Sequence, residues 1–184
     1  MSTFLSSALK QFSYYRQLGT NAMLQCEEPQ LFQEPAPGIN SIAVVVKHMH
    51  GNMLSRWTDF LTSDGEKEWR KRDDEFEPSL SSAEDVFDLW NEGWKCVFDA
   101  IEPLTDEHLE QLIYIRNEGH TVTEAITRQL CHYAYHTGQI VYLAKIYKGE
   151  AWQSLSIPRG GSAVFNAAKF NQEKGRRHFT DNSQ

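Results

Sequence analysis

Two histidines lie four residues apart in a long helical pattern of this sequence. His132 and His136 are about 40° apart around a helix, so both rings lie on one face. That face also carries apolar residues, so we expect both imidazoles to point into the protein interior, where two rings without partners would be costly. A metal ion would satisfy both rings, and this spacing suits two ligands of one ion. The alternative is that each ring binds a backbone carbonyl or a carboxylate.

A third histidine ligand has two candidates in an earlier helical pattern. His48 and His50 are two residues apart and point to opposite sides of a helix, so at most one of them can join the pair. Both fall on the flanks of an apolar stripe, and His50 lies somewhat nearer the centre of that stripe. Periodicity therefore does not select His48 and slightly favours His50.

Four long segments have the apolar spacing of helices and would position these histidines. Each of the last three segments starts at a residue suited to an N-cap. These residues are Asn40 or Ser41 for the second segment, Ser81 or Ser82 for the third and Thr121 for the fourth. Prolines and glycines mark the loops between the segments. The predicted helices span residues 4–26, 41–61, 82–101 and 122–148.

The same pattern predicts the fold class. No stretch shows sustained alternation with β-branched residues, so we predict an all-α four-helix bundle with long connecting loops and extra short helices. One short helix is expected over residues 105–112 and another within 151–170. We expect residues 1–174 to form this domain and residues 175–184 to be a flexible tail. The predicted interior contains Phe12, Tyr15, Val45, Met49, Trp57, Phe87, Trp90, Trp94, Ile126, Ile140 and Leu143.

Composition and charge exclude several classes of protein. The net charge of -7 disfavours a nucleic-acid partner. The longest apolar run, residues 42–46, is too short to span a membrane, and the first residues lack the apolar core of a secretory signal. Cys26, Cys96 and Cys131 are far apart and odd in number, which does not suit a disulfide framework. We therefore expect a cytoplasmic protein with free thiols.

The segment 64–77 is polar, and its charges alternate in sign. We interpret it as a loop that Trp69, Phe76 and salt bridges hold against the helices, with a substrate lid as the alternative.

Two stretches resemble a branch of the DinB/YfiT-like superfamily, a branch mostly described as a domain of unknown function. The first, HMHGNMLSRWTDFLTSDGEKEWRKRDDEFE, runs from His48 through Glu77. The second is HYAYHTGQIVYLAK with the trailing LSIPRGGSAVFN. The resemblance covers nearly all of the chain. It implies a four-helix bundle in which one histidine of the second helix joins the HxxxH pair, and its spacing to Asn52 favours His48 over His50.

The implied site is a divalent metal bound by His48, His132 and His136. Three neutral imidazoles leave a coordination position open, which is typical of reactive sites. Nitrogen ligands suit zinc, nickel, copper or iron, and we expect zinc or nickel. Four nearby polar residues are candidates for supporting the metal or contacting a substrate: Asn52, Arg56, Arg128 and Gln139. The alternative is that each of them makes only a structural hydrogen bond.

The resemblance also implies an activity. Several DinB/YfiT-like proteins resemble metal-dependent transferases that activate a low-molecular-weight thiol and direct it at a small electrophile. The alternatives are a metal-dependent hydrolase and a non-catalytic metal-binding or stress-response module. The sequence reveals no nucleophile and no general base at a recognisable spacing, so catalytic residues stay unassigned. We also expect a homodimer, because the chain has more aromatic residues than one small core requires.

Overall fold

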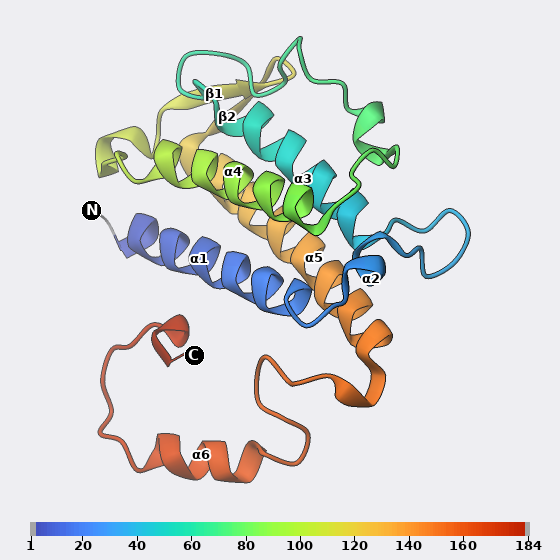
Figure 1. Ribbon diagram of the computed structural model, residues 1–184. Coiled ribbons are helices and arrows are strands. Elements are labelled where there is room, and N and C mark those ends of the chain that lie inside the picture. Colours follow the sequence, from blue (N-terminus) through green and yellow to red (C-terminus); the bar gives the residue numbers. More distant parts are fainter. Residues whose placement is uncertain (1–2, 183–184) are drawn as a thin grey trace.

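The computed structural model describes residues 3–182 and is mostly helical. Figure 1 shows four long helices side by side, with α3 against α4 and α5, and α1 against α5 and α4. The predicted segments correspond to these helices, although the second helix ends four residues earlier than expected. The four helices are α1 (Thr3–Met23), α3 (Ile42–Trp57), α4 (Ala83–Ile101) and α5 (Val122–Lys148).

The helices begin at the polar residues expected from the sequence. The Ser41 hydroxyl accepts a hydrogen bond from the backbone N–H of Val44 at the start of α3. Ser82 forms a reciprocal capping box at the start of α4, and Thr121 forms another with Glu124 at the start of α5. Gly149 follows α5 with a positive φ of 53°, a conformation that favours glycine.

A small β-hairpin corrects the prediction of an all-α fold. Strands β1 (Leu112–Ile115) and β2 (Glu118–Thr121) pair antiparallel, with Ile115 opposite Glu118. The helix predicted over 105–112 is reduced to a short 3-10 turn, η2 (Asp106–His108). Because Thr121 ends β2 and also caps α5, the hairpin leads directly into the helix that carries two of the histidines.

The four long helices enclose a core rich in aromatic rings. Most of the predicted interior residues are buried, whereas Tyr15 and Phe87 are only partly buried at its edge. The phenol of Tyr133 joins two helices, because it accepts a hydrogen bond from Nε1 of Trp57 (2.9 Å) and donates one to Oδ1 of Asn52 (3.2 Å). This arrangement fixes how α5 sits against α3.

The remaining elements are short. Helix α2 (Glu28–Phe32) precedes α3, and the 3-10 helix η1 (Asp73–Phe76) lies in the connection between α3 and α4 and packs against α3. After α5 come η3 (Gly149–Ala151), α6 (Ser162–Phe170) and η4 (Phe179–Asn182). None of the helices in residues 3–182 is long and apolar enough to cross a membrane.

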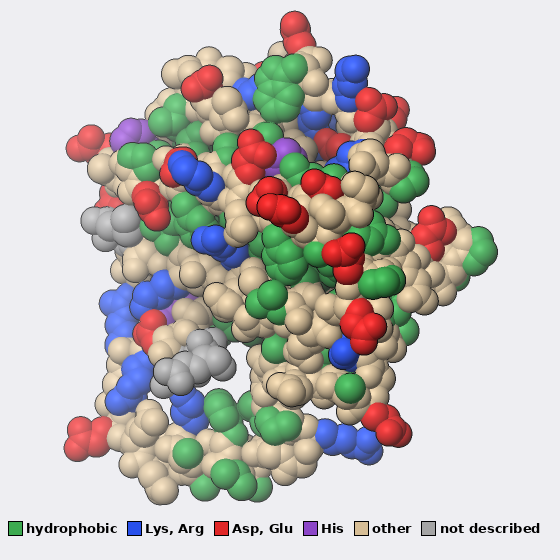
Figure 2. Space-filling view, in the orientation of Figure 1, with side chains coloured by type: hydrophobic (Ala, Val, Ile, Leu, Met, Phe, Trp, Pro, Cys, Tyr) green, Lys and Arg blue, Asp and Glu red, His purple; other side chains and the backbone are tan. Residues whose placement is uncertain are grey.

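The C-terminal arm, residues 152–182, packs against the core at its start through Trp152 and Leu155, whereas its middle part with α6 runs apart from the four long helices (Figure 1). Helix α6 contains no buried residue. The end of the arm contacts α1 through a hydrogen bond between His178 and Ser7 and an ion pair between Asp181 of η4 and Lys10. Figure 2 shows Lys and Arg side chains gathered on this arm and acidic side chains across the face formed by α4. The expected flexible tail includes these η4 contacts, and residues 183–184 lie outside the described part of the chain.

Candidate metal site

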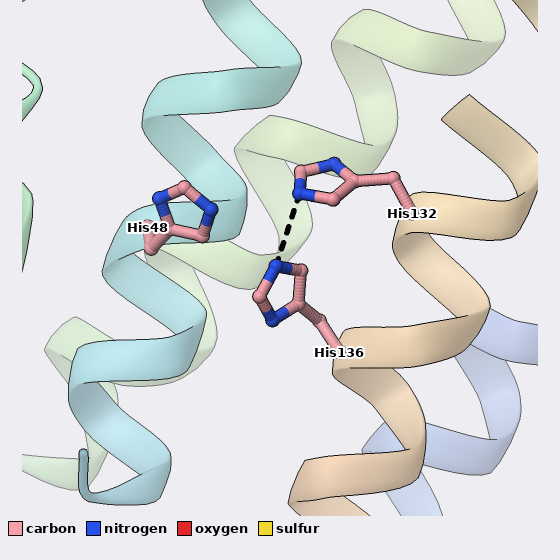
Figure 3. A group of neighbouring side chains, drawn as sticks. All are labelled: His48, His132 and His136. Atoms are coloured by element: carbon pink, nitrogen blue, oxygen red, sulfur yellow. Dashed lines mark hydrogen bonds between the residues drawn. The ribbon is translucent and has the colours of Figure 1, made fainter. Parts of the chain in front are cut away.

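Three histidines from two helices meet between α3 and α5. Each of His48, His132 and His136 offers one ring nitrogen, and these three atoms lie within 4.8 Å of one another. Nε2 of His132 and Nε2 of His136 are 3.0 Å apart (Figure 3). Two nitrogens bound to one tetrahedral ion with bonds of about 2.0–2.1 Å lie about 3.3 Å apart. The separation of the pair is therefore close to that of two ligands of one ion, and the third nitrogen lies within 4.8 Å of both.

The second nitrogen of His48 is held by a carboxylate. Nδ1 of His48 lies 2.9 Å from Oε2 of Glu75, and both side chains are buried. The Phe76 ring stacks on the imidazole at a centroid distance of 5.0 Å. Since Nδ1–H is donated to Glu75, Nε2 of His48 is left as the ligand atom. This carboxylate–histidine arrangement is common behind metal ligands, where it fixes the ring and raises its basicity.

Glu75 is itself held in place by two features. Nε and Nη2 of Arg70 donate to its two oxygens at 2.7 and 3.0 Å. Burial opposes the charge of Glu75, but hydrogen bonds from His48 and Arg70 outweigh it and hold the pKa of this carboxyl below its usual range. The carboxylate also lies directly against Gly51 of α3, where any side chain would overlap it. Glu75 is therefore a charged partner of His48 in a closely fitted position.

The two histidines of α5 differ in their outer nitrogens. Nδ1 of His136 lies 2.8 Å from Oε1 of Gln139 and must donate to it, because an amide oxygen can only accept. Nδ1 of His132 is buried and has no hydrogen-bond partner among the described residues. His136 thus presents Nε2 as a bare acceptor, and His132 donates Nε2–H to it.

The site strongly favours neutral imidazoles. Burial lowers the pKa of His132 to about 3, with further lowering from the charges of His136 and His48. Burial also lowers the pKa of His136, against an opposing effect of its hydrogen bond to Gln139. Only neutral imidazole binds a metal, so the surroundings keep these rings in the state that coordination needs.

Polar contacts hold the segment between α3 and η1 over this end of α3. The Ser55 hydroxyl and the Arg56 guanidinium both donate to the carbonyl of Gly65, and Arg56 also pairs with Glu66 at 3.1 Å. Arg116 of the hairpin turn pairs with Glu66 at 3.0 Å. The salt bridges expected in the segment 64–77 are therefore present, and they connect it to both α3 and the hairpin.

The other predicted site residues are placed in different ways. Gln139 contacts His136 directly. Asn52 instead accepts a hydrogen bond from Tyr133, and Arg56 binds the Gly65 carbonyl and Glu66. Asn52 and Arg56 therefore belong to structural networks next to the cluster. Arg128 is exposed on α5. His50 lies outside the cluster, since its Nε2 pairs with Glu92 of α4 at 2.9 Å.

The most important supporting residues of the cluster are not recognisable from the sequence. Glu75 and Arg70 were seen only as members of an alternating charged run, and nothing in their spacing to His48 identified them. Phe76 contacts the site as an apolar anchor, as expected for this segment. The same expectation for Trp69 is wrong, because 56% of that residue is exposed.

A family model matches residues 1–161, a range that contains all three histidines and Glu75. The model is described as protein of unknown function (DUF1572). The chain belongs to this family. The matched region of this DUF1572 chain ends just before α6, so the outer part of the C-terminal arm lies beyond it.

A solved structure has a similar fold. It is described as the crystal structure of the conserved protein of locus from Enterococcus faecalis, and it matches the DUF1572 chain with a TM-score of 0.61. The match covers 82% of this chain and 99% of that chain at 15% sequence identity, a level at which the likeness concerns the fold alone. No curated protein matches the chain.

Proposed function

We propose that this chain is a DinB-like four-helix-bundle protein that binds one divalent transition metal, zinc or nickel, and acts as a metal-dependent thiol transferase. The observation that carries the proposal is the cluster of three ring nitrogens within 4.8 Å. Two of the three rings have their outer nitrogen fixed by Glu75 or Gln139, so each presents Nε2 toward the others. Ligands of this kind, with no fourth protein donor in the cluster among residues 3–182, suit a reactive rather than a structural site.

Three neutral ligands leave the charge of a bound ion undiminished. An ion held by His48, His132 and His136 would supply Lewis acidity that lowers the pKa of a thiol. In the proposed transfer the thiol sulfur would form a bond to an electrophilic carbon, the leaving group would depart with its electron pair, and the thiol proton would pass to solvent. The chain's role is to hold the rings neutral and oriented.

The thiol in this proposal is a small molecule. The protein's own cysteines do not belong to the three-histidine cluster: Cys131 is exposed on α5, and burial raises the pKa of the Cys26 and Cys96 thiols. A low-molecular-weight thiol and a small electrophile are therefore the proposed substrates.

A hydrolase is the weaker alternative. Metal-assisted hydrolysis generally uses a nearby carboxylate or histidine as a general base. Glu75 is the carboxylate beside the cluster, but His48 and Arg70 engage both of its oxygens. A base whose oxygens are both occupied in this way is poorly placed to accept a proton from water.

Two measurements test the proposal. Elemental analysis of the purified protein is expected to give about one zinc or nickel per chain. Turnover of a fluorogenic alkylating probe with a panel of small thiols is then expected to require both metal and thiol. Turnover with water alone would favour the hydrolase, and tight metal binding without turnover would favour a non-catalytic module.

We also propose that the chain forms a homodimer. Two features support this proposal. Helix α6 leaves the apolar residues Val164 and Phe170 largely exposed. The C-terminal arm is basic although the chain has a net charge of -7, so the arm of one copy suits the acidic surface of another. Light scattering is expected to give twice the chain mass, and Val164→Ser with Phe170→Ser is expected to give the monomer. A monomeric mass for the unmodified chain would refute this.

A further inference from the structure

His132 differs from the other two histidines of the cluster in its surroundings. Glu75 fixes the outer nitrogen of His48 and Gln139 fixes that of His136, whereas Nδ1 of His132 is buried without a partner in the described structure. An unpaired buried polar atom destabilises a fold, so such atoms need an explanation. The explanation lies in which ring nitrogen of His132 carries the proton.

The hydrogen bonds determine the tautomers of the pair. His136 donates Nδ1–H to Gln139, so its Nε2 is an acceptor, and the 3.0 Å contact requires that His132 donates Nε2–H. Nδ1 of His132 is then a bare acceptor. When an ion is bound by Nε2 of both rings, the proton of His132 must lie on Nδ1 instead. Nδ1 becomes a donor and needs an acceptor.

Gln129 provides an acceptor at the right position. It lies three residues before His132, so the two side chains are neighbours on one face of α5. Its side chain is buried, and its Oε1 has no hydrogen-bond partner among the described residues. Figure 3 shows the second ring nitrogen of His132 pointing away from His136. Gln129 precedes His132 on α5, whereas His136 follows it.

We propose that Gln129 is a positioning residue for the metal site and accepts a hydrogen bond from Nδ1–H of His132 when the ion is bound. Metal binding then moves the His132 proton from Nε2 to Nδ1 and satisfies two buried atoms that otherwise lack partners. Each of the three histidines acquires its own outer partner: Glu75 for His48, Gln129 for His132 and Gln139 for His136. This inference rests on the proposed metal site.

The first test reads the tautomer of His132 directly. Nitrogen-15 spectra of histidine-labelled protein, with His132 assigned from the signals lost in His132→Ala, are recorded with chelator and then with one equivalent of Zn²⁺. We expect Nε2–H in the first spectrum and Nδ1–H in the second. Nδ1–H in both spectra would overturn the proton shift while leaving the metal site intact, whereas Nε2–H in both spectra would show that His132 does not bind the ion through Nε2.

The second test measures Zn²⁺ affinity by competition with a chelating indicator. Gln129→Met removes the acceptor at similar volume and is expected to lower affinity about 10- to 100-fold. Gln129→Glu retains an acceptor and is expected to stay near the unmodified value. Thr137→Val is the matched control, because Thr137 is also buried on α5 and its Oγ1 has no hydrogen-bond partner within residues 3–182. Equal affinities for Gln129→Met and the unmodified chain would overturn the inference, whereas no binding by the unmodified chain would refute the metal site itself. If Gln129→Met fails to fold, Gln129→Asn, which keeps the amide but withdraws its oxygen by one methylene, takes its place, and an unchanged affinity in that variant would overturn the inference.

Discussion

Oε2 of Glu75 lies 2.9 Å from Nδ1 of His48, although 27 residues separate them along the chain. One residue belongs to a long helix and the other to a one-turn 3-10 helix in the following connection. Their contact links the three-histidine cluster to a segment outside the four long helices.

Removal of any one histidine of the cluster is expected to abolish tight metal binding. His48→Ala, His132→Ala and His136→Ala each remove one of three ligands, so affinity is expected to fall by more than the roughly 10- to 100-fold loss typical of an outer partner. His50→Ala is the control, because His50 pairs with Glu92 outside the cluster. Metal content after dialysis against dilute Zn²⁺ measures the effect. Loss of metal in His50→Ala and retention in His48→Ala would contradict the assignment.

Neutralising Glu75 is expected to weaken the site without removing a ligand. Glu75→Gln keeps the shape but loses the charge that supports the His48 ring and pairs with Arg70. We expect affinity for Zn²⁺ to fall about 10- to 100-fold in a competition titration. Glu77→Gln, a change at an exposed acidic residue two positions away, is expected to leave affinity unchanged. A similar loss in both variants would indicate a general charge effect instead.

Gly51 is expected to be required for the position of Glu75. In Gly51→Ala the new methyl group overlaps the Glu75 carboxylate, so we expect weaker metal binding despite the better helix propensity of alanine. Gly138 on α5 has open space around it. Gly138→Ala is therefore expected to stabilise the fold by about 0.5–1 kcal/mol and to leave affinity unchanged. Urea unfolding and Zn²⁺ titration of the two variants check both halves of the prediction.

Stability of the chelator-treated protein is expected to fall as the pH falls below about 6.5, the ordinary histidine pKa. Burial lowers the pKa of His132 in the fold to about 3. Between these values the unfolded chain binds a proton that the folded chain does not, so the free energy of unfolding decreases toward acid. The lowered pKa of His136 adds in the same direction, and that of Glu75 adds a further loss below about pH 4.5. Above about 6.5 these histidines contribute no further change.

Urea unfolding at pH 7.5, 6.0 and 5.0 measures this dependence. The variant His132→Gln lacks the titrating ring and is expected to show a shallower decrease. An equal free energy of unfolding at pH 7.5 and 5.0 in the unmodified chain would contradict the burial of a neutral His132.

Local chemistry made the long helices predictable. Helix α5 begins and ends as expected, because Thr121 with Glu124 caps one end and Gly149 stops the other. The hairpin was missed because its two-residue turn uses Arg116 and Asn117, both with positive φ, and not the usual Asn-Gly. Backbone N–H groups of both turn residues donate to the Asp64 carboxylate, so a distant segment stabilises the turn.

The cluster was only partly visible in the sequence. Spacing along α5 identified His132 and His136, but an apolar stripe could not separate His48 from His50. Helix α3 is buried on several sides, since it packs against α4, α5 and η1, and its two histidines face different neighbours. Glu75 depends on tertiary contacts across the connection between α3 and α4, which residue spacing does not encode.

The connection that carries Glu75 is held mainly by ion pairs and hydrogen bonds, whereas the helices are held by a buried aromatic core. These two kinds of contact respond differently to the surroundings, so the connection can open locally while the helices stay folded. Strong salt weakens its partly exposed pairs, such as Arg116 with Glu66, more than the core. Release of the ion is therefore expected at milder conditions than melting of the helices, and a sample with a full helical spectrum can already have lost its metal.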